Sequence, residues 1–124
     1  MDLGLDGQTI TNQVFDYAMS VTTDAGFELR VENDYALGTS MGSWNLSPES
    51  GNADPERVLS LTGRTISSAT TDRSGTLNVI FADGHHLTVR SDVDYEAWSL
   101  AGPGGRKVVC MPGGDLAVWR AEAS

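Results

Sequence analysis

The sequence has little cysteine and no long apolar run, and each shortage excludes a class of protein. A single cysteine, Cys110, among 124 residues leaves no intrachain disulfide, so a packed core has to stabilise the fold. No apolar stretch approaches the roughly 20 residues that a membrane-spanning helix needs. The chain opens on Met1-Asp2-Leu3-Gly4, without the basic and apolar regions of a signal peptide. We therefore expect a cytoplasmic protein with no membrane partner.

Basic residues are also scarce. Eight Lys and Arg stand against seventeen Asp and Glu, which gives a net charge of −9. Phosphate backbones repel an anion of this kind, so nucleic-acid binding is disfavoured and a basic protein partner is favoured. The alternative is that the charge serves solubility alone.

What is present indicates one globular domain over residues 1–124, with 40% hydrophobic and 20% charged residues. It contains an internal repeat. The segment LGLDGQTIT at 3–11 matches LSLTGRTIS at 59–67, and AGFELRV at 25–31 matches DGHHLTV at 83–89. Further matches join Asp34-Tyr35 to Asp94-Tyr95 and Trp44-Asn-Leu46 to Trp98-Ser-Leu100. The repeat therefore spans 3–46 and 59–100, with a terminal hairpin at 106–120.

Each copy is expected to form three strands. A three-residue loop at 82–84 lets Phe81, Val79 and Leu77 face His85, Leu87 and Val89, and a loop at 24–26 does the same in the first copy. This register requires positive φ at Gly26 and Gly84. The expected strands lie at 9–15, 19–23, 27–32, 65–71, 76–81, 85–90, 106–111 and 115–120.

The fold class that follows is mostly β, an antiparallel sandwich or partly closed barrel of six to nine strands. It is built from the two repeated three-stranded units, with one or two short helices. The helices are expected at 54–59, where Asp54 and Pro55 resemble an N-cap and N1 pair, and at 91–97. Residues 38–54 resemble a loop.

Residues typical of catalysis are few. His85 and His86 are adjacent in a strand and so point to opposite faces, which argues against a shared metal ion; His85 is expected to be a packed or hairpin-end residue. Cys110 is expected to be buried, although it is also a candidate nucleophile. The glycines at 102–105 and 112–114 suit turns and not a phosphate loop. We expect no metal, no cofactor and no enzyme.

The strongest candidate for binding is a run of acids beside aromatic residues. It comprises Asp92, Asp94, Tyr95, Glu96 and Trp98. Such a run can form an acidic and aromatic binding patch. It can also be the solvated start of a helix. Because Trp44 and Trp98 are equivalent in the repeat, both are expected to pack in the core or between the repeats.

The end of the chain carries a resemblance. Tyr95-Glu-Ala-Trp98-Ser-Leu100, Gly102-Pro103 and Val109-Cys110-x-Pro112-Gly113-Gly114-x-Leu116-Ala117-Val118-Trp119 resemble a family of small uncharacterised domains associated with actinobacteria. Short acidic chains of this kind are similar to the immunity proteins of polymorphic toxin systems. The resemblance implies a non-catalytic inhibitor that binds a basic, toxin-like protein. The alternative is a small-molecule-binding or enzymatic domain that uses the cleft between the two repeats, with His85 and Cys110.

Overall fold

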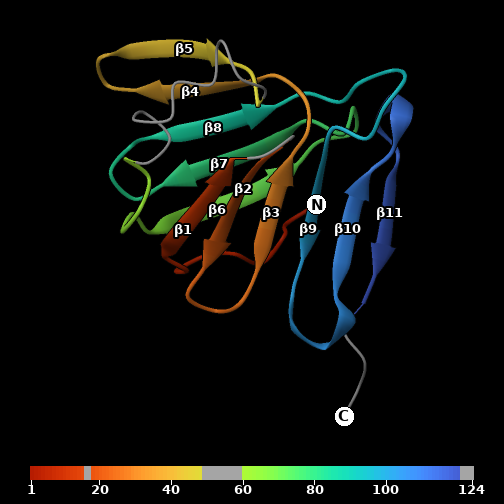
Figure 1. Ribbon diagram of the computed structural model, residues 1–124, viewed down its shortest axis with the longest axis horizontal. Helices are drawn as coiled ribbons and strands as arrows, with labels where there is room; N and C mark the ends of the chain where they lie inside the picture. Colours follow the sequence, from red (N-terminus) through yellow and green to blue (C-terminus); the bar gives the residue numbers. More distant parts are fainter. Residues whose placement is uncertain (16–17, 49–59, 121–124) are drawn as a thin grey trace.

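The computed structural model describes residues 1–15, 18–48 and 60–120, and it contains two antiparallel sheets (Figure 1). The six-stranded sheet has the order β1 (Ile10–Phe15), β2 (Met19–Thr23), β3 (Glu28–Val31), β9 (Trp98–Ala101), β10 (Lys107–Cys110), β11 (Leu116–Trp119). The five-stranded sheet has the order β5 (Gly42–Leu46), β4 (Tyr35–Thr39), β8 (His86–Val89), β7 (Leu77–Phe81), β6 (Ile66–Thr71). The sandwich prediction is confirmed, and the sheets do not close into a barrel.

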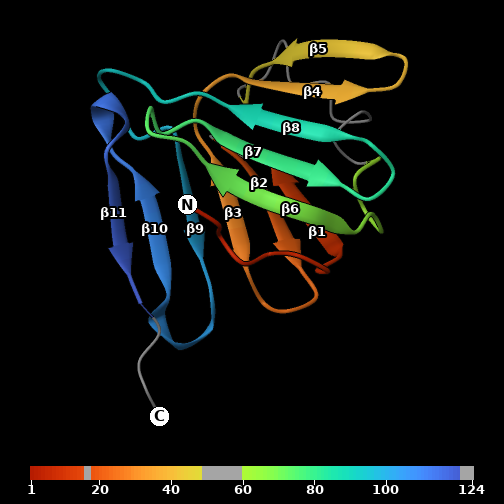
Figure 2. The ribbon, with the colours of Figure 1, turned by 180° about the vertical axis from the view of Figure 1, so that it is seen from behind.

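The two sheets pack face to face because their strands alternate between buried apolar and exposed polar side chains. In β7, Leu77, Val79 and Phe81 are buried while Ile80 on the other face is 47% exposed. The inner faces of both sheets contribute to one hydrophobic cluster. The six-stranded sheet is the wider one, so β10 and β11 extend past the edge of the five-stranded sheet (Figures 1 and 2). Part of β11 is consequently left without a facing sheet.

The predicted hairpin registers are confirmed. Val21 pairs with Leu29 in β2–β3, and Val79 pairs with Leu87 in β7–β8. The loop glycines Gly26 and Gly84 have φ of 86° and 93°. The terminal hairpin is also confirmed, with Val108 opposite Val118 around the 3-10 turn at Pro112–Gly114.

The beginnings of β1 and β6 bind each other reciprocally. The N–H of Gly7 donates to the C=O of Ile66 at 2.8 Å, and Gly63, fifty-six positions later than Gly7, donates to the C=O of Ile10 at 2.8 Å. Thr9 forms a bridge with Thr65 at the centre of this arrangement. The two segments with matching sequence therefore meet across a local, approximately twofold contact.

The chain then exchanges strands between the sheets. β4, which follows β3, does not pair with it but joins β8, so that Tyr35 lies opposite Val89. β9, which follows β8, joins β3, so that Trp98 lies opposite Val31. Thus β9, which follows β6–β8 in the sequence, extends the set β1–β3, and β4, which follows β1–β3, extends the set β6–β8.

Several sequence predictions are wrong. Residues 38–46 are not a loop, because β4 and β5 form a hairpin there, and the described residues form eleven strands. The equivalence of Trp44 with Trp98 fails, because Trp44 lies in the edge strand β5 and the position that corresponds to Trp98 is Tyr35. Residues 91–97 are irregular, with bends at 93–95, and do not form a helix. The helix expected at 54–59 lies outside the described residues.

Candidate functional site

The 92–96 loop, which comprises Asp92, Val93, Asp94, Tyr95 and Glu96, connects β8 to β9 and lies beside the β10–β11 turn (Figure 1). Its first residue organises it locally. The Asp92 carboxylate accepts the N–H groups of Asp94 at 2.8 Å and Tyr95 at 3.2 Å, which is the Asx-turn geometry that aspartate favours. Asp92 is therefore a structural residue of the loop.

Both ends of this loop are held by backbone hydrogen bonds. At one end, the N–H of Gly113 donates to the C=O of Asp92 at 2.8 Å. At the other end, the C=O of Ala97 accepts the N–H groups of Glu32 at 2.8 Å and Asn33 at 3.1 Å. These bonds limit the conformations open to the loop, so less entropy is lost when a partner binds it.

The side chains between those two ends face solvent. Val93 is 81% exposed and Tyr95 is 74% exposed. Asp94 and Glu96 alternate with them, and within the described residues neither carboxylate accepts a hydrogen bond. No Lys or Arg occurs between Arg90 and Arg106, so the three acids of the loop have no basic residue among them. The arrangement presents an apolar and aromatic centre between free negative charges.

Trp98 does not belong to this surface. Its side chain is 1% exposed, and its indole N–H donates to the C=O of Gly75 at 3.0 Å. The prediction that Trp98 packs in the core is confirmed, and its place in the binding patch is wrong. The other four predicted residues lie together on the loop, and Val93 joins them as a residue that the sequence analysis missed. An isolated valine among acids gives no sequence signal beyond its neighbours.

The two histidines point apart. His85 lies at the end of the β7–β8 hairpin, with a 19% exposed side chain and Nδ1 3.1 Å from the Asp83 carboxylate. Burial, followed by the positive charges of Arg64 and His86, lowers the pKa of His85 below 6.5. His86 lies on the outer face over Gly38. In the part of the chain that the structure describes, no group of three His, Cys, Asp or Glu side chains is arranged to hold a metal ion.

Cys110 is fully buried, and its thiol is 3.5 Å from the C=O of Gly75. Burial raises the pKa of this thiol, which disfavours the reactive thiolate. Gly75 precedes β7 and His85 follows it, so Cys110 and His85 lie toward opposite ends of that strand. The structure does not bring these two candidates together.

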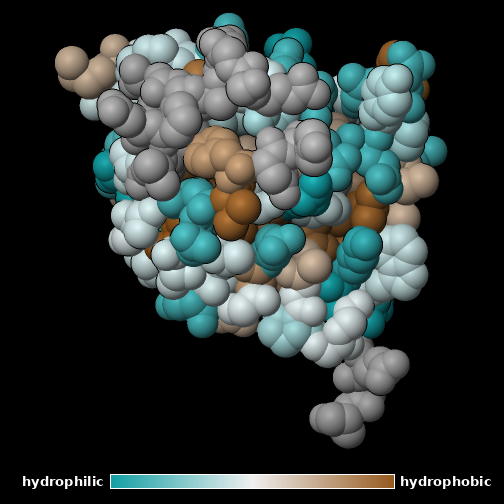
Figure 3. Space-filling view, viewed as in Figure 1, coloured by the Kyte–Doolittle hydropathy of each residue, from teal (hydrophilic) through white to brown (hydrophobic). Residues whose placement is uncertain are grey.

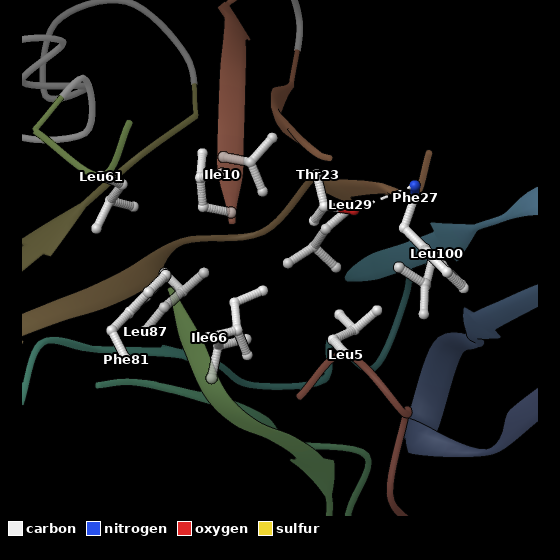
Figure 4. Close-up of a pocket in the computed structure, with 12 residues that line it drawn as sticks. Leu5, Ile10, Thr23, Phe27, Leu29, Leu61, Ile66, Phe81, Leu87 and Leu100 are labelled. Atoms are coloured by element: carbon white, nitrogen blue, oxygen red, sulfur yellow. Dashed lines mark hydrogen bonds between the residues drawn. The ribbon is translucent and has the colours of Figure 1, made fainter. Parts of the chain in front are cut away.

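The space between the sheets is filled. The gap there has a volume of about 10 Å³, which is at the lower limit for one water molecule (Figure 4). Its lining is apolar except for Thr23. A ligand or substrate would have to displace core side chains to enter. This gap, as the described residues pack it, is too small to hold a small-molecule ligand.

A larger depression, of about 770 Å³, lies open on the outer face of the five-stranded sheet. It is lined by Ala36 of β4 and by polar residues that include Asn45 of β5, Thr88 of β8 and Arg90, which follows β8. Its polar and shallow form differs from the concave, mostly apolar pockets that hold small ligands.

No helix in the described ranges has the length and apolar character that crossing a membrane requires. The comparisons add a family without adding a function. No curated protein and no solved structure matches the chain. A family model does match, over residues 1–120, and the chain thus belongs to a family of unknown function, DUF6188.

Proposed function

We propose that this chain is a non-catalytic, acidic protein-binding module that acts on a basic partner, in the manner of an immunity protein or toxin inhibitor. The observation that carries the proposal is the 92–96 loop, in which Val93 and Tyr95 are exposed between free carboxylates on a backbone held at both ends. Aromatic anchors contribute much of the binding energy of protein interfaces, and complementary charge accelerates association. The cytoplasm is the expected compartment.

The internal repeat is part of this proposal. We infer that residues 1–124 form one domain, built from the three-stranded units β1–β3 and β6–β8. The reciprocal hydrogen bonds of Gly7 and Gly63, and the shared register of the β2–β3 and β7–β8 hairpins, support it. In this arrangement the repeats provide the scaffold, and the 92–96 loop is an addition to the second unit.

The test separates recognition from stability. Asp94 and Glu96 are changed together to Lys, which moves the net charge from −9 to −5. The control pair, Asp6→Lys with Asp34→Lys, makes the same change in net charge at two exposed carboxylates elsewhere. A partner recovered from the cognate lysate by the wild-type chain is then measured against all three proteins by surface plasmon resonance.

The loop variant should slow association by about tenfold or more at low salt, since steering contributes factors of about 10 to 1,000. The control pair should change the association rate much less, and neither pair should alter the melting temperature appreciably. The difference between variants should shrink with added salt, because charges are screened over about 8 Å at physiological ionic strength. Equal association rates for the loop variant and the control pair contradict the proposal.

A further inference from the structure

β11 is an edge strand whose outward hydrogen-bonding groups have no partner in the described chain. It is the last strand of its sheet and pairs with β10 alone. The N–H of Met111 donates to the C=O of Asp115 at 2.7 Å, so these two residues form a hydrogen-bonded pair. Hydrogen-bonded and non-hydrogen-bonded pairs alternate along an antiparallel ladder. Ala117 and Trp119 therefore direct their N–H and C=O groups toward β10. Leu116 and Val118 therefore direct their N–H and C=O groups away from the sheet.

The side chains of this edge are apolar. Residues 116–119 read Leu-Ala-Val-Trp, with Val118 44% exposed and Trp119 52% exposed. Natural edges usually carry a charge or a proline, or are covered by another segment. The edge strand β6 is covered here, because the N–H of Leu3 donates to the C=O of Ala69 at 2.9 Å. β11 itself contains neither a charge nor a proline, and no segment of the described residues covers its edge.

We propose that β11 pairs antiparallel with β11 of a second copy of this chain, which joins two six-stranded sheets into one of twelve strands. A twofold axis perpendicular to the sheet keeps the inner faces of the two copies on the same side of the joined sheet. Each residue of β11 therefore lies opposite a residue whose side chain points to the same face. Because Leu116 and Val118 direct their N–H and C=O groups outward, Leu116 forms a hydrogen-bonded pair with Val118 of the second copy. Ala117 then lies opposite Ala117 at the axis.

Size and charge both favour this register. The pair at the axis is not hydrogen-bonded, so its Cα atoms approach to about 4.5 Å, and two methyl groups suit that distance. On the outer face, Asp115 lies opposite Trp119 of the second copy. The Nζ of Lys107 lies 6.0 Å from the centroid of the Trp119 ring within each copy. Each Asp115 carboxylate therefore lies near a Trp119 ring that has the Lys107 ammonium beside it.

The register shifted by two residues, with Val118 at the axis, is less favourable. It sets Leu116 opposite Arg120 and Ala117 opposite Trp119, so it has as many apolar pairs, but it loses the small residue at the axis and the approach of Asp115 to Trp119 and Lys107. A depression of about 390 Å³ beside this end of β11, lined in part by Met1, Arg106 and Val118, leaves room for the inner-face side chains of a second copy. The edge is thus accessible on its inner face, because the five-stranded sheet does not extend over this part of β11.

The test is the oligomeric state by sedimentation equilibrium over a range of concentrations. The wild-type chain should dimerise, and Val118→Lys should weaken the dimer by about tenfold or more, because each new lysine ammonium would be buried opposite the apolar Leu116 of the second copy. Val93→Lys is the matched control, since it changes an exposed valine outside the edge and should leave dimerisation intact. Circular dichroism checks that both variants fold. A wild-type chain that stays monomeric near millimolar concentration overturns the proposal.

Cross-linking tests the register directly, because only one residue of β11 is replaced by cysteine and the rest of the edge is unchanged. Ala117→Cys should form an intermolecular disulfide on mild oxidation, since Cα atoms about 4.5 Å apart lie within the range for that bond. Val118→Cys should not cross-link efficiently, and neither should the wild-type chain, whose Cys110 is buried. Efficient cross-linking through residue 118 instead of 117 refutes the arrangement. The edge and the 92–96 loop are different surfaces, so failure here leaves the proposed function standing.

Discussion

Gly84 and Gly75 allow the cost of a backbone conformation to be separated from the cost of a close approach. Their φ angles are similar, at 93° and 84°. A Cβ added to Gly84 would meet nothing within 4 Å, whereas a Cβ added to Gly75 would lie 2.5 Å from the carbonyl oxygen of Gly114 and 2.7 Å from its Cα. Both neighbours of Gly75 are backbone atoms, which cannot rotate away.

Gly84→Ala should therefore lower the free energy of unfolding by only about 1–2 kcal/mol, which is the cost of a left-handed conformation for a residue with a Cβ. Gly75→Ala should lose that amount and about 1–3 kcal/mol more for overpacking, a total of about 2–5 kcal/mol. The strain would also reach Trp98 and Cys110, which both contact the C=O of Gly75.

The assay is urea unfolding followed by tryptophan fluorescence, with the melting temperature as a second readout. A loss of 1 kcal/mol shifts the melting temperature by roughly 4 °C in a domain of this size. Equal losses for the two variants would refute the reasoning, because they would mean that the β6–β7 loop and the β10–β11 turn are not in close contact.

Three further predictions concern single side chains. Trp98→Phe should lower the free energy of unfolding by about 1–2 kcal/mol, because the C=O of Gly75 loses the indole donor and keeps the weaker Cys110 thiol. Denaturant unfolding measures this loss. Cys110 should be unreactive toward a thiol reagent in the native chain and react fully in urea, since it is buried and its pKa is raised; a fast native reaction contradicts this. The pKa of His85 measured by NMR should lie below 6.5. Because the folded state binds that proton less readily than the unfolded one, the contribution of His85 to stability should be present above pH 6.5 and decline as the pH falls toward the folded pKa, and His85→Asn should remove this dependence.

The parts of the fold that could be predicted from sequence are those specified by local patterns. The β7–β8 register follows from alternating apolar residues and from Gly84 at the left-handed position, and both signals lie within a dozen residues. The hairpin β4–β5 was missed because its glycines and serines resemble a loop. Gly38 is small for a reason that only the tertiary structure shows, namely that the ring of His86 lies over it.

The candidate site was predicted in position but not in the roles of its residues. Three acids in a row of five favoured either a binding patch or a helix start. The structure divides them: the Asp92 carboxylate caps the loop, whereas the carboxylates of Asp94 and Glu96 accept no hydrogen bond from the described residues. The helix does not form because the chain must pair with β3 from Trp98 onward. Trp98 and Tyr95 are three positions apart, and the argument that placed Trp98 in the core, its equivalence with Trp44, does not hold in the structure.

The exchange of strands between the two sheets has a consequence for how the chain is made. While the ribosome is still synthesising the second half, β3 has one edge open, because its partner β9 has not yet emerged. β4 has no strand to join until β8 follows. Pairings so distant in sequence slow folding, and open edges attract other chains in the meantime. Neither half should fold when it is expressed alone, whereas fragments 1–48 and 60–120 mixed together should complement each other, since each supplies the strand that the other lacks.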